Sequence, residues 1–412
     1  MKERRIEKFA SVIVNIGVAL QDGQMLVINA PLEAATLVKY ITKIAYEQKH
    51  SKQVIINFSD AEVNKQEQLY ASQETLNNMP NYAIEKYKYI VENGAAMLSI
   101  SSPKPGIMAG VDPARLQEAN RVIAPQIAFF RKYTMENDGQ WCVVACPNDI
   151  WAKKVFPELE TEEAVEKLWE AILYASHVSI DNDPVAEWNK INEDLTKRNE
   201  ILNNYNFESL HFKNSLGTDI TIGLVENHIW AGGGEHSKKG VYFNPNIPTE
   251  ENFCMPHNKK INGVVVATKP LNYAGKLIED FTLTFKDGKV VDFSAAKEED
   301  ALKSLIEFDK GSSSLGEVAL ISHDSPISNM NILFYNTLFD ENASCHLALG
   351  ASYTTTNLKD ADKYTEEELD ALGSNQSHTH VDFMFGSSDM EVTGLTHDGK
   401  VVPIFKNGNF VF

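Results

Sequence analysis

The sequence predicts an α/β N-terminal domain with a largely parallel sheet, followed by an α+β C-terminal domain rich in antiparallel strands. Three observations support this prediction. Short apolar runs alternate with helix-like segments in the first half, Asp-Gly and Asn-Gly turn signals separate short strands in the second half, and nine of the 11 histidines follow residue 200. Because a domain usually holds roughly 100–200 residues, the 412 residues suffice for two domains, which we place at 1–205 and 206–412.

The first domain is predicted from the alternation of two kinds of segment. Five apolar runs have the length of a strand: Val12–Val18, Met25–Ile28, Val54–Phe58, Ala95–Ile100 and Trp141–Ala145. Helical patterns lie between them, for example at Leu32–Glu47 and Asn81–Val91. Such alternation is typical of strand–helix–strand units and therefore indicates a parallel sheet.

Two helices are expected before the second domain, one beginning at the capping residue Thr161 and one containing Trp188. In the second half, Asp287-Gly288 separates two apolar runs and indicates a β-hairpin. The remaining predicted features are the turns at Asp398-Gly399 and Asn407-Gly408 and the helices at Ala295–Phe308 and Thr365–Leu372. Antiparallel strands with a few helices define an α+β domain.

The charge balance excludes two classes of partner. With 38 Lys and Arg against 57 Asp and Glu, the chain has a net charge of −19, so it repels the phosphates of nucleic acids and anionic membranes. Four cysteines do not form a disulfide scaffold and fit a reducing compartment. The apolar stretch Val12–Leu20 is too short to span a bilayer, and no apolar signal core follows the basic N-terminal residues. We therefore expect a cytoplasmic protein that binds neither nucleic acid nor membrane.

The segment Ser377–Gly386 (SHTHVDFMFG) is the most informative part of the sequence. On a strand, His378, His380 and Asp382 project from one face, because successive side chains alternate between the two faces. A buried carboxylate needs a partner. A divalent metal is one such partner, since imidazole and carboxylate together suit Zn²⁺, Co²⁺ or Mn²⁺. An exposed strand face with a His–Asp hydrogen bond explains the same pattern.

Other acidic residues become candidates only in combination. Glu341 and His346 are five residues apart, which matches neither one helical face nor one strand face, so a loop must bring them together. Glu250 and Glu251 point to opposite sides if their segment is extended, so that one could bind a metal while the other orients a water. Glu317 opens an apolar strand. Taken singly, each of these acids is also explained by a position on the surface.

Together, these segments supply four carboxylates and two imidazoles, from Glu251, Glu317, Glu341, His346, His380 and Asp382. Two divalent ions that share a bridging carboxylate need about that many protein ligands. The motifs that contain them are long: residues 243–256 (FNPNIPTEENFCMP), 338–350 (LFDENASCHLALG) and 380–386 (HVDFMFG). They resemble the aminopeptidase T and aminopeptidase S family of dinuclear metallopeptidases, and residues 151–157 (WAKKVFP) resemble a signature in the first domain of that family.

The resemblance implies a role for each matching residue. The six residues above would bind two divalent metal ions per subunit, Zn, Co or Mn, in the C-terminal domain, with Glu317 as the bridging carboxylate. Tyr353, seven residues beyond His346, would be catalytic. Glu250 is the general base by analogy with Glu–Glu pairs in other dinuclear aminopeptidases, and no role follows for His378.

Such a protein removes the N-terminal residue from short peptides with a free N-terminus, using a water that bridges the two metals. The resemblance also implies a homodimer with enclosed active sites. Two alternatives remain open. One is another metal-dependent amidohydrolase, such as a deaminase, which the His378-x-His380 pair suggests, although amidohydrolase barrels place such a pair on an early strand. The other is a metal-binding or peptide-binding protein of the same fold without catalytic activity.

Overall fold

The computed structural model describes residues 2–412 and divides into two compact units. The first unit contains the chain up to Lys190 together with Gly234–Pro248, and the second contains Ile191–Gly233 and Thr249–Phe412. The predicted fold class is confirmed, since the first unit holds a parallel sheet and the second holds antiparallel sheets. Within residues 2–412, no helix combines the length and the apolar character that crossing a membrane requires.

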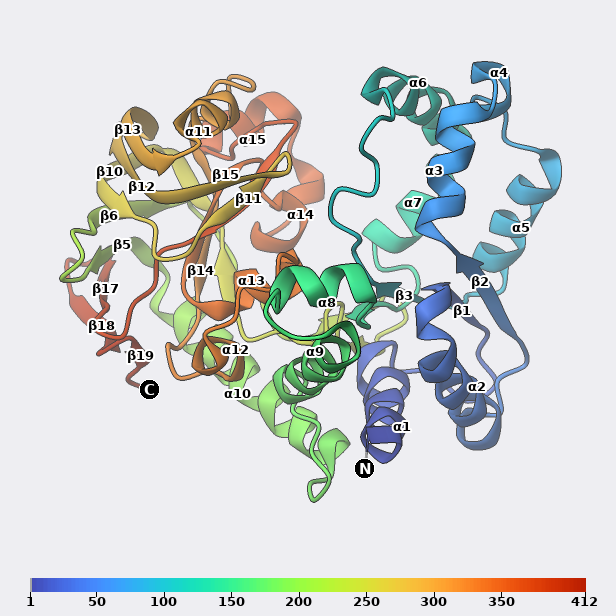
Figure 1. Ribbon diagram of the computed structural model, residues 1–412. Helices are drawn as coiled ribbons and strands as arrows, with labels where there is room; N and C mark the ends of the chain where they lie inside the picture. The colour runs from blue at the N-terminus through green and yellow to red at the C-terminus, as the bar shows by residue number, and fades with distance from the viewer. Residues whose placement is uncertain (1) are drawn as a thin grey trace. The chain divides into compact units, whose positions relative to one another are not determined.

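The sheet of the first unit has the strand order β2-β1-β3-β4, and all neighbours are parallel. Its strands are β1 (Leu26–Pro31), β2 (Val54–Ser59), β3 (Ala96–Ser101) and β4 (Trp141–Ala145). Helices connect them in sequence and are seen in blue and green in Figure 1. These are α2 (Ala35–Lys49), α3 (Ala61–Tyr70), α4 (Gln73–Leu76), α5 (Asn81–Glu92), α6 (Pro113–Ile123) and α7 (Ala128–Met135), followed by α8 (Asp149–Val155), α9 (Thr161–Ala175) and α10 (Pro184–Tyr205). The short strands β7 (Glu235–His236) and β8 (Tyr242–Phe243) form a separate pair. Four of the five predicted strands are therefore present.

The predicted strand at Val12–Val18 is wrong. Helix α1 (Lys2–Val12) continues into a π-helical turn at Ile13–Gly17. Every residue from Val12 to Leu20 is buried except Asn15, which is half-buried. A segment that is buried on all sides produces a continuous apolar run whether it is a helix or a strand, so its periodicity does not separate the two.

The larger sheet of the second unit is antiparallel, with the order β11-β12-β10-β6-β5-β17-β18-β19 and with β13 beside β12. Its strands are β5 (Phe207–Lys213), β6 (Asp219–Leu224), β10 (Pro256–Val266), β11 (Leu271–Tyr273), β12 (Lys276–Lys286), β13 (Lys289–Lys297), β17 (Glu391–Thr396), β18 (Val401–Lys406) and β19 (Asn409–Phe410). The predicted hairpin at Asp287-Gly288 joins β12 to β13. The predicted helix at Ala295–Phe308 begins later than expected, because β13 extends to Lys297 and helix α11 is Glu299–Ile306.

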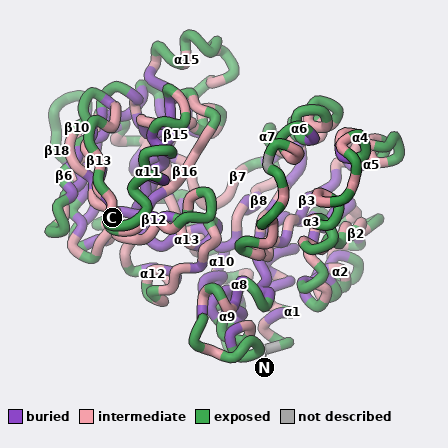
Figure 2. The backbone as a smooth tube through the Cα atoms, turned by 45° about the horizontal axis from the view of Figure 1, so that its top comes forward, coloured by how far each residue is buried: buried purple, intermediate pink, exposed green. Residues whose placement is uncertain are grey.

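A smaller antiparallel sheet has the order β16-β15-β14-β9. Its strands are β9 (Asn252–Cys254), β14 (Leu315–Leu320), β15 (His346–Gly350) and β16 (His380–Met384). Short helices lie in the connections: α12 (Pro326–Met330), α13 (Thr337–Asp340), α14 (Thr354–Asn357) and α15 (Glu366–Leu372). Figure 2 shows β15 buried and α15 exposed, in agreement with the side-chain burial of both elements.

The two faces of the smaller sheet differ in chemistry. Leu347, Leu349 and Phe383 point into the apolar core that this sheet shares with the larger one. Ring contacts within that core include Phe281 with Phe383, whose centroids are 5.6 Å apart. Because side chains alternate along a strand, the residues between these apolar ones project from the opposite face. The alternation in β15 and β16 therefore places the even-numbered residues on a second face, away from the shared core.

Candidate metal centre

The opposite face of the smaller sheet brings together polar side chains that are far apart in the sequence. Strand register places Ala348 on β15 directly beside Asp382 on β16 and beside Glu317 on β14. His346 and His380 lie two residues before Ala348 and Asp382 along their strands, so both share this face. Two antiparallel pairings thus position two imidazoles and two carboxylates around a small, fully buried alanine.

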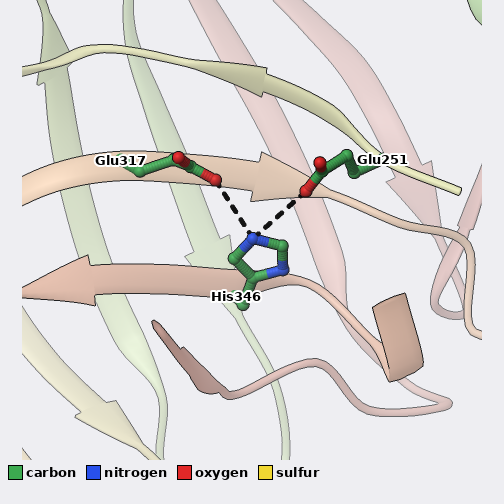
Figure 3. Close-up of side chains that lie close together, drawn as sticks. All are labelled: Glu251, Glu317 and His346. Atoms are coloured by element: carbon green, nitrogen blue, oxygen red, sulfur yellow. Dashed lines mark hydrogen bonds and ion pairs between the residues drawn. The ribbon is translucent and has the colours of Figure 1, made fainter. Parts of the chain in front are cut away.

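The first cluster consists of Glu251, Glu317 and His346. Nε2 of His346 lies 3.1 Å from Oε1 of Glu317 and 3.4 Å from Oε2 of Glu251 (Figure 3). One potential ligand atom from each residue falls within 4.8 Å of the others. This spacing allows all three side chains to contact one metal ion.

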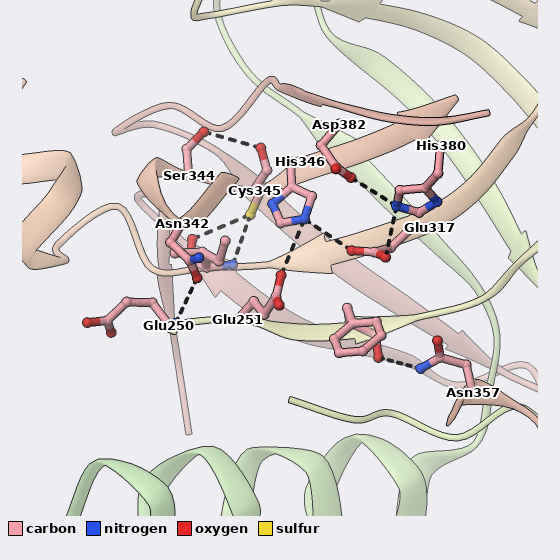
Figure 4. Close-up of polar contacts among 12 residues, drawn as sticks. Glu250, Glu251, Glu317, Asn342, Ser344, Cys345, His346, Asn357, His380 and Asp382 are labelled. Atoms are coloured by element: carbon pink, nitrogen blue, oxygen red, sulfur yellow. Dashed lines mark hydrogen bonds and ion pairs between the residues drawn. The ribbon is translucent and has the colours of Figure 1, made fainter. Parts of the chain in front are cut away.

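The second cluster consists of Glu317, His380 and Asp382. Nε2 of His380 lies 3.5 Å from Oε2 of Glu317 and 3.3 Å from Oδ1 of Asp382 (Figure 4). Glu317 therefore directs one oxygen toward each histidine and belongs to both clusters. Its side chain is 6% exposed, so both contacts lie inside the protein.

Two further predicted residues lie near the clusters. Glu341 begins a 3₁₀ turn before β15, and the charges of Glu251 and Asp382 act on its carboxyl group. The ring of Tyr353 is centred 4.4 Å from the ring of His380, and the residue is half exposed. Both were predicted from the resemblance, and both are within electrostatic reach of the site.

The side chains of Glu250 and Glu251 point in different directions. In Figure 4 the carboxylate of Glu250 points away from the two clusters, as the alternation of an extended segment requires. The backbone N–H of Glu250 donates to Oδ1 of Asn342 at 2.8 Å. Asn342 is fully buried, and its amide also donates to the carbonyl of Leu338 at 3.3 Å. This asparagine thus joins the segment of Glu251 to the turn that begins at Glu341.

His378 is not part of either cluster. Strand β16 begins at His380, so the predicted strand face does not extend back to His378. Its backbone N–H donates to Oδ2 of Asp309 at 2.7 Å, and its side chain is exposed. The histidine pair that suggested an amidohydrolase is therefore not a pair of neighbouring ligands in this structure.

Burial and mutual repulsion shift the pKa values of the acids. Burial raises the pKa of Glu251 to about 8; the charge of His346 opposes this, and those of Glu317 and Asp382 add to it. Burial, followed by the charges of Glu251 and Asp382, also raises the pKa of Glu341 well above its usual range. Burial acts in the same direction on Asp382, but the hydrogen bond and charge of His380 hold its pKa below the usual range.

The histidines and Tyr353 respond to the same negative charges. Burial acts to lower the pKa of both histidines, yet the neighbouring carboxylates raise it to about 10 for His346 and about 9 for His380. The partial burial of the Tyr353 phenol, followed by the charges of Glu317 and Asp382, raises its pKa, so this hydroxyl keeps its proton. The face therefore attracts positive charge.

The donor set fits divalent metal ions. Oδ1 of Asp382 is buried and lies 3.3 Å from Nε2 of His380, and a cation is a common partner of a buried carboxylate oxygen. Nδ1 of His380 lies 2.7 Å from the carbonyl of Ala351. That contact fixes the ring so that Nε2 faces Glu317 and Asp382, as is usual for a metal-binding histidine.

Two contributors were missed by the sequence prediction. Ala348 leaves space between Glu317 and Asp382, and Asn342 holds the backbone of Glu250. Both lie inside the motif 338–350. Strand alternation places Ala348 on the face of His346, so its position near the site could have been predicted from the sequence. No sequence pattern indicates the role of Asn342.

The imidazoles and carboxylates of this face form a donor set that could hold metal ions. Residues 2–410 match the family model described as thermophilic metalloprotease (M29). The chain therefore belongs to the M29 peptidase family, and the resemblance found in the sequence is confirmed.

The relatives extend over the whole chain. Aminopeptidase 2 of Geobacillus stearothermophilus is 46% identical over 410 residues, covering 100% of this chain and 98% of that protein. Aminopeptidase AmpS of Bacillus subtilis (strain 168) is 43% identical over 409 residues, covering 99% of each chain. Among solved structures, wild-type AmpT from Thermus thermophilus matches with a TM-score of 0.90 and 35% identity over 100% of both chains.

Proposed function

We propose that this protein is a metalloaminopeptidase that removes the N-terminal residue from short peptides at a dinuclear metal centre. The observation that carries the proposal is the position of Glu317, which directs its two oxygens toward two different histidines. The names of the relatives, which are aminopeptidases, support the reaction. The same comparison supports a peptide substrate with a free N-terminus.

The proposed ligands divide between the two clusters. Glu251 and His346 would hold one ion, with Glu341 beside them, and His380 and Asp382 would hold the other. Glu317 would contact both ions. Zn, Co and Mn all fit a set of imidazoles and carboxylates. Ions held by these residues would lower the pKa of a coordinated water and polarise the scissile carbonyl.

Side chains of the protein would transfer protons and stabilise charge during the reaction. Glu250 is proposed as the general base that accepts a proton from water and returns it to the leaving amine. Since its carboxylate points away from the clusters in Figure 4, this role requires rotation of the side chain toward the scissile bond. If Glu250 has this role, Glu250→Gln lowers kcat and leaves the metal content unchanged.

Tyr353 is proposed as a donor to the oxygen that becomes negative during hydrolysis. Its raised pKa keeps the hydroxyl protonated, and its ring lies beside His380. The loss of one such donor typically costs about 3–4 kcal/mol in the transition state. The carboxylates of the face would also attract the α-amino group of the substrate, which favours cleavage next to a free N-terminus.

We also propose that the protein is a cytoplasmic homodimer. The location follows from the composition, and the four cysteines are free buried thiols, as a reducing compartment allows. The oligomeric state follows from the family resemblance. Size-exclusion chromatography with light scattering measures it directly.

One experiment separates the proposal from its alternatives. Purified protein is assayed on aminoacyl fluorogenic amides and on their N-acetylated counterparts, before chelation, after chelation, and after Zn²⁺, Co²⁺ or Mn²⁺ is restored. We expect cleavage of the free amines only, lost on chelation and regained with metal. Cleavage of the acetylated substrates would indicate a different amidohydrolase. Bound metal without any hydrolysis would indicate a binding protein.

A further inference from the structure

The chain that leaves strand β15 and enters helix α14 links the two clusters of the candidate metal centre. At its beginning, the carbonyl of Ala351 lies 2.7 Å from Nδ1 of His380. The ring of Tyr353 then lies 4.4 Å from the ring of His380 and 6.3 Å from the ring of Phe253. Phe253 is on strand β9, two residues after Glu251. Tyr353 is therefore located between a histidine of the second cluster and the strand that follows a carboxylate of the first.

Asn357 attaches the far end of this chain to β9. The residue is buried, and its side-chain amide donates to the carbonyl of Phe253 at 3.2 Å (Figure 4) and to that of Ile229 at 3.1 Å. Its backbone N–H donates to the carbonyl of Tyr353 at 2.9 Å, and its carbonyl accepts a hydrogen bond from the N–H of Ile229 at 2.8 Å. Both amide hydrogens are thus used, and Asn357 connects Tyr353 to β9.

Strand β9 is a fixed reference for this connection. Phe253 pairs with Ala319, which in turn pairs with His346, so Phe253 projects from the face that carries the clusters. On its other side, Phe253 exchanges two backbone hydrogen bonds with Ala231, at 2.8 and 3.0 Å. The backbone of β9 is therefore paired without Asn357. The bond from Asn357 adds a connection from this strand to the chain that carries Tyr353.

Tyr353 needs such a connection because little else orders its surroundings. Helix α14 has only four residues, and it begins directly after Tyr353. A single helical turn is not stable by itself in water, because its nucleation is unfavourable. Tyr353 is also 49% exposed, so packing restrains only part of its side chain. A donor that stabilises a transition state must nevertheless be placed accurately.

We propose that Asn357 is a positioning residue that holds Tyr353 where its hydroxyl can donate to the developing oxyanion. This inference rests on the proposed aminopeptidase function, in which Tyr353 is that donor. Since both amide hydrogens of Asn357 are bonded to backbone carbonyls, the effect of Asn357 on catalysis passes through Tyr353. Its removal should slow the chemical step and leave KM and the bound metal nearly unchanged.

The test is a double-mutant cycle of Asn357→Ala and Tyr353→Phe. The value of kcat is measured on leucine p-nitroanilide and normalised to bound metal. Tyr353→Phe should lower kcat by roughly 100- to 1000-fold, and Asn357→Ala by roughly 10- to 100-fold. The double variant should be no slower than Tyr353→Phe, because the position of an absent hydroxyl has no effect. Decreases that multiply would show that Asn357 acts independently of Tyr353 and would overturn the inference.

A second measurement is independent of the fraction of folded enzyme. The phosphonic acid analogue of leucine resembles the tetrahedral intermediate, so its inhibition constant should rise by roughly 10-fold or more in Asn357→Ala. The inhibition constant of leucinol, which has no tetrahedral oxyanion, should stay nearly unchanged. An unchanged constant for the phosphonic acid, or an equal rise for both inhibitors, would contradict the role of Asn357.

The matched control is Asn203→Ala. The side chain of Asn203 exchanges two hydrogen bonds with the backbone of Trp230, at 2.8 and 3.0 Å. Its removal therefore loosens the segment of Ile229 from the side of helix α10 and leaves the bonds of Asn357 in place. Asn203→Ala should keep the wild-type kcat and inhibition constants. An equal loss of kcat in both variants would show an effect of general rigidity and overturn the inference.

Two further outcomes are distinguished. If Asn357→Ala does not fold, Asn357→Ser takes its place, since a hydroxyl donates one hydrogen bond where the amide donates two; wild-type kcat in that variant would overturn the inference. If Tyr353→Phe is slow while the folded Asn357 variants are not, only the positioning role is wrong. If Tyr353→Phe keeps the wild-type kcat, the proposed role of Tyr353 fails, and the role of Asn357 fails with it.

Discussion

The shared position of Glu317 predicts an unusual effect of a single substitution. Glu317→Gln keeps the shape of the side chain and removes its negative charge. Because Oε1 lies 3.1 Å from Nε2 of His346 and Oε2 lies 3.5 Å from Nε2 of His380, both proposed metal positions lose a charged ligand. At about 1.5–3 kcal/mol for each charged contact, each position should bind metal roughly 10- to 150-fold more weakly. The substitution is therefore expected to weaken two sites, not one.

The assay is metal stoichiometry after equilibrium dialysis, measured by mass spectrometry of the bound ions. Asp382→Asn is the matched control, since Asp382 contacts only the second cluster. It should leave one tight site, whereas Glu317→Gln should leave none. Circular dichroism verifies that both variants are folded. If Glu317→Gln retains one tight site, or two, then Glu317 does not bridge the ions and the argument from its two oxygens is wrong.

Smaller changes test how the site is built. Ala348→Val places two methyl groups between the carboxylates of the site, so the amount of bound metal should fall. Overpacking should also lower the free energy of unfolding by about 1–3 kcal/mol. The control is Ala301→Val, and full metal binding by Ala348→Val would refute the prediction. Asn342→Ala leaves the N–H of Glu250 without its acceptor, which should lower the free energy of unfolding by about 1–3 kcal/mol. It should also weaken metal binding at the first cluster more than at the second. Asn342→Asp is the control, because it keeps an acceptor. Equal weakening of both clusters would contradict that role. Burial lowers the pKa of His228 below its ordinary value of 6.5. Near that pH the unfolded chain therefore binds more protons than the folded chain does. The free energy of unfolding should consequently rise with pH through about 6.5. Urea denaturation of the wild type and His228→Gln on either side of this pH measures the effect, and identical pH dependence would refute it.

The sequence predicted the parallel sheet well because its strands are short apolar runs between helices. Val54–Phe58 and Trp141–Ala145 match β2 and β4 to within one residue. The failure at Val12–Val18 has a physical cause. The segment is buried on all sides, and its residues Ile13, Val14 and Ile16 would suit the interior of a parallel sheet equally well. Only tertiary packing decides between helix and strand there.

The sequence contained the residue types of the candidate site but not their geometry. The alternation in residues 380–384 placed His380 and Asp382 on one face, as β16 does. The meeting of that face with Glu317 depends on strand pairings between residues more than 30 positions apart, which no local pattern contains. The family resemblance supplied what periodicity could not.

The electrostatics of the site explain why such a face persists in a folded protein. Four carboxylates in a partly buried face repel one another, and the raised pKa of Glu251 and Glu341 shows that the fold disfavours their ionised forms. Well-packed apolar residues would usually be at least as stable there. A divalent cation that binds the native state alone reverses the balance, because its binding free energy adds to the free energy of unfolding. Bound cations would therefore stabilise an arrangement in which Glu251 and Glu341 resist ionisation, as expected of a face kept for its chemistry.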